Sequence, residues 1–124
     1  MSKPAEYDID MCQGSDFKIK LVIKDNTGTP LDITGWTFAA EMRRTISDST
    51  VLAAFSFNIT DAVNGEVEMA MDAATTGALP LKDQKENTRE TEDFAYDVER
   101  TDGGGDIQRI IQGVVKVSPE VTRV

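Results

Sequence analysis

Apolar and polar residues alternate along most of this chain. The clearest run covers residues 17–24, where Phe17, Ile19, Leu21 and Ile23 occupy every second position. Such alternation is typical of a β-strand that buries one face and exposes the other. Other runs of the same kind predict strands at 7–11, 36–42, 51–59, 67–71, 94–98 and 107–117.

The segments between these runs carry turn signals. Asn64-Gly65 separates two alternating runs and favours a hairpin, and residues 25–28 and 102–106 have the composition of tight turns. Residues 72–80 begin with Asp and end with Pro, which predicts one short helical turn that crosses between sheets. Residues 81–93 are charged and lack apolar periodicity, so we expect a long mobile loop there.

About seven short strands with frequent turns predict an all-β fold, namely an antiparallel immunoglobulin-like β-sandwich with one short helical crossing. A length of 124 residues fits a single domain spanning 1–124. We expect Trp36, which follows a proline-started and glycine-broken passage, to plug the core between the sheets. The predicted core aromatic residues are Trp36, Phe38, Phe55, Phe57, Phe94 and Tyr96.

The composition of the chain disfavours several classes of function. Twenty-two acidic residues against 13 basic ones give a net charge of -9, which disfavours nucleic acid as a partner. The chain has no histidine, the commonest metal ligand and acid–base residue. Its one cysteine, Cys12, is expected to be a small buried apolar residue. No apolar run predicts a signal peptide or a membrane span, so we expect a soluble protein made in the cytoplasm.

Two acidic features are candidates for reactive sites. Asp8 with Asp10, and Asp97 with Glu99, could form carboxylate pairs on the outward positions of strands, but no cleft is predicted that would tune a catalytic pair. The segment 102–106 could be a calcium loop, yet it lacks the ligand set of a known one and is better explained as a turn. We therefore predict no catalytic residue, no cofactor and no metal site.

A basic stripe and a charged loop are the remaining exposed features. Lys18, Lys20 and Lys24 lie on the polar face of the strand at 17–24, where they are expected to be solvated or to protect a sheet edge. The loop 81–93 is the candidate partner-binding element, although its mixed charges are equally compatible with no contact. Its candidate binding residues are Lys82, Asp83, Lys85, Glu86, Arg89 and Glu90.

Several motifs, in this order, resemble small virion proteins of tailed bacteriophages. The motifs are Gly-Ser-Asp-Phe at 14–17, Asp-Asn-Thr-Gly-Thr-Pro-Leu-Asp-Ile-Thr-Gly at 25–35, Leu-Pro at 79–80, Phe-Ala-Tyr-Asp-Val-Glu at 94–99, and residues 113–123. The set is similar to the N-terminal immunoglobulin-like domain of the baseplate upper protein. Only the segment 81–93 is longer than the corresponding passage in that family.

The resemblance implies a non-enzymatic adaptor of the phage tail or baseplate, located in the virion. It would dock other virion proteins, in many copies within a symmetric assembly, with no nucleic acid or membrane partner, and act as a stand-alone subunit. A capsid decoration protein is the alternative within the structural class. A carbohydrate-binding module is the alternative of another class, although the predicted aromatic residues point inward rather than forming a sugar platform.

Overall fold

The computed structural model of the chain describes residues 4–81 and 90–122. Within these ranges lie eight strands and one short helix. The strands are β1 (Ala5–Glu6), β2 (Ile9–Cys12), β3 (Phe17–Val22), β4 (Thr37–Arg43), β5 (Ala53–Asp61), β6 (Glu66–Met71), β7 (Glu92–Thr101) and β8 (Ile107–Ser118), and the helix is α1 (Ala73–Gly77).

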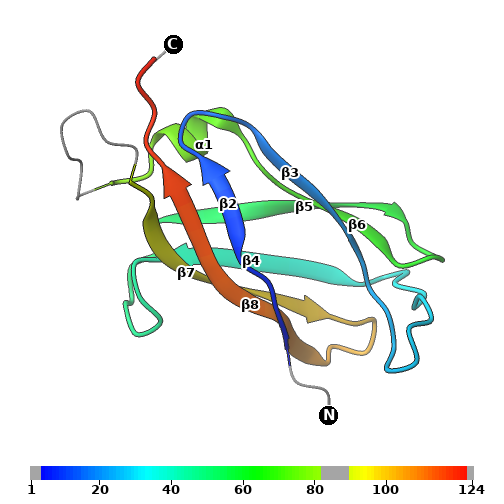
Figure 1. The fold of residues 1–124 in the computed structure, drawn as a ribbon. Coiled ribbons are helices and arrows are strands. Elements are labelled where there is room, and N and C mark those ends of the chain that lie inside the picture. Colours follow the sequence, from blue (N-terminus) through cyan, green and yellow to red (C-terminus); the bar gives the residue numbers. More distant parts are fainter. Residues whose placement is uncertain (1–3, 82–89, 123–124) are drawn as a thin grey trace.

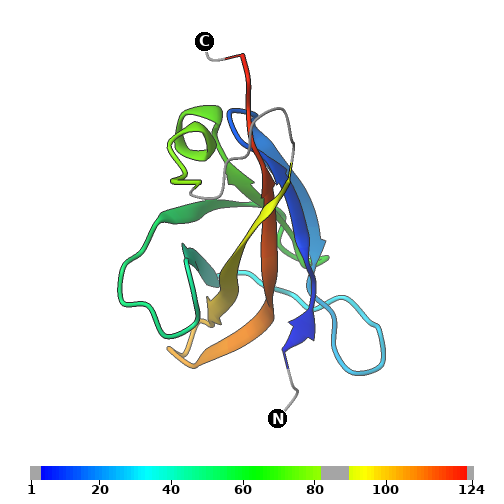
Figure 2. The same ribbon diagram turned by 60° about the vertical axis from the view of Figure 1, so that its left-hand side comes forward.

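The strands form an immunoglobulin-like β-sandwich (Figures 1 and 2). Their order is β1-β8-β7-β4-β5-β6-β3, with β2 also paired to β8. In constant-type immunoglobulin domains, the third, sixth and seventh strands share one sheet, and the second, fifth and fourth share the other. If β1 and β2 together count as the first strand, then β4, β7 and β8 match the former group, and β3, β6 and β5 match the latter.

Strand β5 joins the two sheets. Its first residues pair with β4, and residues from Ser56 onward pair with β6, so hydrogen bonding continues around one side of the sandwich. The opposite side is not closed by a ladder between β3 and the N-terminal strands in the described residues. The result is a half-barrel with two sheet edges on its open side.

The predicted antiparallel pairing holds for the other ladders but not for the N-terminal edge, which is parallel and makes the sheet mixed. Strands β1 and β2 both run parallel to β8, and the first two residues of the predicted strand at 7–11, Tyr7 and Asp8, form the break between them. At the interruption the Asp8 carboxylate accepts the Val114 backbone N–H at 3.0 Å. The buried Tyr96 hydroxyl donates to the Tyr7 carbonyl oxygen at 2.5 Å. These side chains replace ladder hydrogen bonds where the backbone leaves the register.

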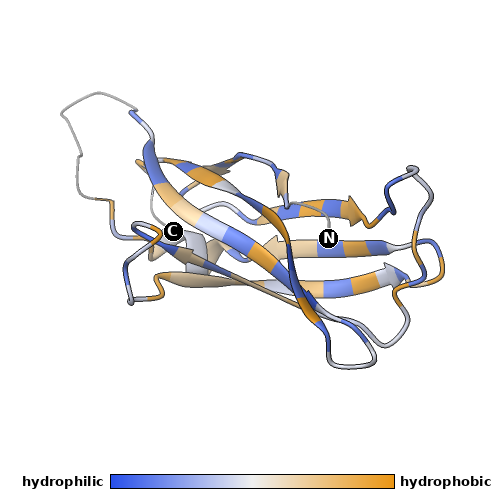
Figure 3. Ribbon diagram, turned by 90° about the horizontal axis from the view of Figure 1, so that it is seen from below, coloured by the Kyte–Doolittle hydropathy of each residue, from blue (hydrophilic) through white to orange (hydrophobic). Residues whose placement is uncertain are grey.

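The core lies between the two layers and is built from inward-facing positions. Figure 3 shows apolar and polar residues alternating along the strands. The buried cluster consists of Ile9, Met11, Ala40, Met42, Ala53, Phe55, Met69, Met71, Leu79, Phe94, Tyr96, Val98, Val115 and Val117. The alternation read from the sequence thus identifies most of the buried positions.

The predicted aromatic core divides into three groups. Phe55, Phe94 and Tyr96 are buried, as predicted. Phe38 and Phe57 are half-buried, stack with 5.6 Å between ring centroids, and pack against the cluster.

Trp36 does not plug the core. It is half-buried and is not part of the buried cluster or of the apolar side chains packed on it. Trp36 comes just before the start of β4, at the rim of the sandwich. The Arg100 guanidinium lies 4.9 Å from the centroid of the Trp36 ring. Ile33, three residues earlier, is fully buried.

The predicted burial of Cys12 is wrong, and the alternation of inward and outward residues is broken in β8. Cys12 is exposed, since Ile9 and Met11 take the inward positions of β2. In β8 the register shifts beside Val98, so Ile110 is the extra residue of a bulge and Ile107 faces outward with 63% exposure. The predicted loop 81–93 is also shorter than expected at its end, because Glu92 and Asp93 belong to β7.

The predicted helical turn is confirmed as α1. The Asp72 side chain caps it by accepting the Thr75 backbone N–H at 2.8 Å. Thr76 is fully buried, and its hydroxyl donates to the Ser15 carbonyl and accepts the Gly14 N–H. These bonds fasten α1 to the turn between β2 and β3.

Candidate docking surfaces

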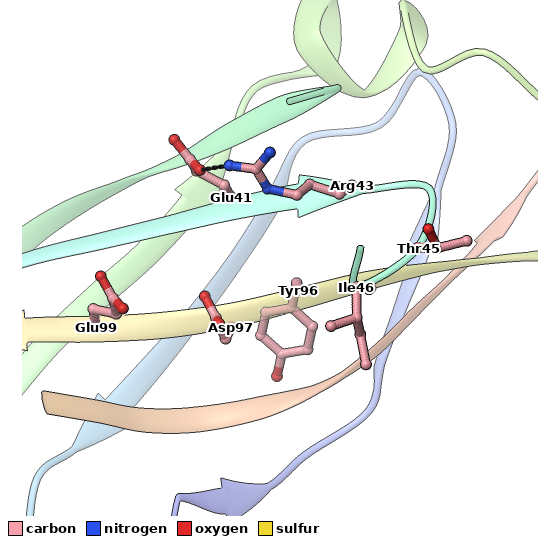
Figure 4. Close-up of a pocket in the computed structure, with 8 residues that line it drawn as sticks. Glu41, Arg43, Thr45, Ile46, Tyr96, Asp97 and Glu99 are labelled. Atoms are coloured by element: carbon pink, nitrogen blue, oxygen red, sulfur yellow. Dashed lines mark hydrogen bonds and ion pairs between the residues drawn. The ribbon is translucent and has the colours of Figure 1, made fainter. Parts of the chain in front are cut away.

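A shallow hollow of about 300 Å³ lies on the outer face of β4 and β7 (Figure 4). The residues that line it are Glu41, Arg43, Thr45, Ile46, Ala95, Tyr96, Asp97 and Glu99. The segment that follows β4 forms its wall and carries Ile46, which is 91% exposed. The hollow therefore combines a charged floor with an apolar wall.

Cross-strand register brings its carboxylates together. Glu41 lies opposite Asp97, and Glu99 is two residues further along β7 on the same face. Arg43 contacts Glu41 at 2.8 Å, and Arg109 approaches Asp97 at 4.0 Å. The sequence had paired Asp97 with Glu99 but gave no signal for Glu41, because alternation does not reveal which strands are neighbours.

This arrangement fits surface recognition better than proton transfer. The side chains of Arg109 and Asp97 are 52% and 46% exposed, so water screens their interaction. A general acid with a raised pKa needs a desolvated carboxylate. The hollow is open, and its ion pairs are available to polar groups of a partner.

A second cavity of about 350 Å³ lies on the open side of the half-barrel, between β3 and the edge formed by β1 and β8. Its lining is mostly apolar: Ala5, Leu21, Val22, Ile23, Lys24, Asn26, Gln108, Arg109, Ile110 and Ile111. Val22 is 41% exposed. We call this cavity the seam groove.

Most of the predicted binding loop lies outside the described residues, namely Lys82, Asp83, Lys85, Glu86 and Arg89. Of its candidate residues, Glu90 is described and is exposed.

The two flanks of that loop meet at Arg44. Its guanidinium binds the Glu92 carboxylate, donates to the Pro80 carbonyl at 2.5 Å, and lies 4.8 Å from the centroid of the Phe94 ring. The sequence did not identify Arg44 as important, since the contacts join segments far apart in the chain.

The glycine-rich turn at 102–106 uses its carboxylates internally. One Asp102 oxygen accepts the N–H groups of Gly104 and Asp106 at 2.9 and 3.0 Å. Arg100 contacts the other Asp102 oxygen at 3.4 Å and an Asp106 oxygen at 3.1 Å. Among residues 4–81 and 90–122, no group of three or more His, Cys, Asp or Glu is arranged to hold a metal ion.

Other carboxylates have local structural partners. Hydrogen bonds from Thr27 and from the backbone lower the pKa of Asp25, and bonds from Thr34 lower that of Asp32. The bonds from Thr75 lower the pKa of Asp72 at the start of α1. Hydrogen bonding to the ionised form explains all three directions.

The helix of the described part is too short to cross a membrane.

Comparison with known proteins does not assign the chain to a family. No protein-family model matches the chain, and no curated protein sequence matches it. Among solved structures, the chain is similar to murine CRIg, with a TM-score of 0.38 and 11% sequence identity over 92% of each chain.

Proposed function

We propose that this protein is a non-enzymatic structural subunit of a tailed-phage virion, in the tail or baseplate, and that it acts by docking other virion proteins. The phage setting comes from the ordered sequence motifs. The observation that supports docking is the unclosed sandwich, because a free sheet edge beside an apolar groove is a surface suited to another polypeptide.

The outer surfaces agree with this proposal. The hollow on β4 and β7 offers exposed ion pairs and the apolar Ile46 side chain, a mixture typical of interfaces between separately folded proteins. Arg44 fastens both flanks of the charged segment that follows α1, so a partner could bind that segment at little cost in ordering its ends.

Immunogold electron microscopy of purified virions tests the placement. An antibody raised against this chain is expected to label the tail or baseplate. Labelling spread over the shell would favour the capsid decoration alternative and refute the tail placement. Absence of the chain from purified particles by mass spectrometry would refute the virion role altogether.

A further inference from the structure

We propose that the free edge of β3 is a strand-addition site, which binds an extended partner segment whose apolar residues alternate with Asp or Glu. This inference rests on the proposed docking function and specifies the chemistry of the partner. It is argued from strand topology, backbone hydrogen bonding, the seam groove and the charge on β3.

The topology leaves one strand position vacant. In constant-type immunoglobulin domains the first strand lies beside the second, so that the sheet has the order first, second, fifth, fourth. Here the first strand is represented by β1 and β2, and both pair with β8 instead. In the described residues, β3 pairs with β6 alone and ends the sheet.

The backbone of β3 is arranged to accept a neighbour on that side. The Ile23 N–H donates to the Gly65 carbonyl at 2.9 Å, in line with the β3–β6 register. Hydrogen-bonded positions alternate in an antiparallel ladder, so odd-numbered residues face β6. The N–H and C=O groups of Lys18, Lys20 and Val22 therefore face the free edge.

The side chains next to this edge leave apolar surface uncovered. Phe17, Ile19 and Leu21 point toward the core but are only half-buried. The seam groove continues this surface to Ile110 and Ile111 on β8. An added strand would place every second residue over the groove and bury this surface.

The charges on β3 select the other residues of the added strand. The Lys18 and Lys20 side chains are 65% and 61% exposed on the outward face. On the side of β3 away from the free edge, these lysines already pair with the acidic, alternating strand β6. Lys18 lies 3.7 Å from Glu68, and Lys20 lies 3.9 Å from Glu66. A partner strand with the same alternation as β6 would give these lysines acidic neighbours on both sides.

The same lysines disfavour a second copy of β3 as the occupant. Two β3 strands paired edge to edge about a two-fold axis would bring their lysine side chains together, and like charges on adjacent strands are unfavourable. The position is thus selective for an acidic strand.

Synthetic peptides test the site on the full chain without knowledge of the natural partner. The probe is a labelled, end-capped peptide of alternating valine and glutamate, and its controls are a valine–lysine peptide and a valine–glutamate peptide with every backbone amide methylated. By fluorescence anisotropy at low salt, we expect the lysine peptide to bind at least about tenfold more weakly and the methylated peptide not to bind. Equal binding of all three would overturn the proposal.

Amide hydrogen exchange, read by NMR, locates the bound probe. The valine–glutamate peptide should protect the amides of Lys18, Lys20 and Val22. The amides of Ile19 and Leu21 should not change, since they already bond to β6. Protection confined to any other strand would refute the site.

A charge exchange provides a variant that retains the ion pairs with β6. Lys18→Glu with Glu68→Lys, and Lys20→Glu with Glu66→Lys, reverses the sign at the edge and keeps opposite charges across the β3–β6 ladder. This variant should prefer the valine–lysine peptide, a reversal that an unfolded chain would not give. Retention of the original preference would contradict charge selection at β3.

Three outcomes separate this inference from its alternatives. Self-association of the chain without peptide, with protection of Lys18, Lys20 and Val22, would assign the edge to a second copy and overturn the proposal. Peptide binding by a chain that is absent from virions would refute the virion role and leave the strand-addition site standing. A chain present in virions that fails to bind the peptide would do the reverse.

Discussion

Replacing Tyr96 with phenylalanine tests the hydrogen bond that holds the N-terminal edge. The Tyr96 hydroxyl donates to the Tyr7 carbonyl oxygen at 2.5 Å, and Tyr96 as a whole is 5% exposed. Tyr96→Phe keeps the ring but leaves that carbonyl without its donor, at a cost of about 1–3 kcal/mol.

The expected change in melting temperature follows from the chain length. An unfolding entropy of about 2.1 cal/mol/K per residue makes each kcal/mol correspond to about 4 °C for a chain of this size. Thermal unfolding followed by circular dichroism should therefore show a drop of about 4–12 °C. Tyr7→Phe is the matched control, because Tyr7 is 49% exposed and its carbonyl is retained, and it should shift the melting temperature by less than about 2 °C. Equal shifts in both variants would refute this reasoning.

Alkaline pH gives a second test of the same group. Burial raises the pKa of Tyr96 above the ordinary value of 10.0. The folded state thus holds the phenolic proton more tightly than the unfolded state, so its contribution is complete below pH 10.0 and is lost as the pH rises further. The stability difference between the wild type and Tyr96→Phe should narrow above that pH. A constant difference would show that Tyr96 is accessible to solvent.

Three further perturbations follow from the structure. Gly65→Ala should lower the free energy of unfolding in urea by at least about 2 kcal/mol, because the φ of Gly65 is 72° and an added Cβ would meet backbone oxygens at 2.6 and 2.8 Å. The control Gly28→Ala, with φ 86° and open space around the added Cβ, should lower it by only about 1 kcal/mol. Equal losses would contradict the clash at Gly65. Trp36→Ala should destabilise the protein by about 1–2 kcal/mol and Phe94→Ala by about 3–5 kcal/mol, the reverse of the order expected from a core tryptophan. The Asp25 carboxylate has a pKa below the ordinary 3.8, so its stabilising effect is present above that pH and is lost as the pH falls through the lower folded-state pKa. In Asp25→Ala the melting temperature should therefore fall less steeply with decreasing pH in this range. An unchanged pH dependence would count against the loop hydrogen bonds.

The sequence by itself determined the local elements. Alternation located the strands because a strand with one buried face must place apolar side chains at every second residue. The Asp72 cap identified α1, and Gly65 marked the hairpin between β5 and β6. These features depend on residues close together in the chain.

Tertiary structure decided everything that depends on neighbours distant in the sequence. The parallel pairing of β2 with β8, the bulge that turns Ile107 outward, and the meeting of Glu41 with Asp97 all depend on register between remote segments. Trp36 has the inward parity of a core residue, yet it precedes the strand and lies at the rim.

The candidate site at the β3 edge also depends partly on the local sequence and partly on tertiary structure. The sequence displayed the alternating lysines of β3, and their interpretation as an edge agrees with the position of β3 at the end of the sheet. It carried no sign that the position beside β3 is vacant, because the N-terminal strand could pair with either β3 or β8. That choice depends on the packing of the whole sandwich, and it leaves β3 with a free edge.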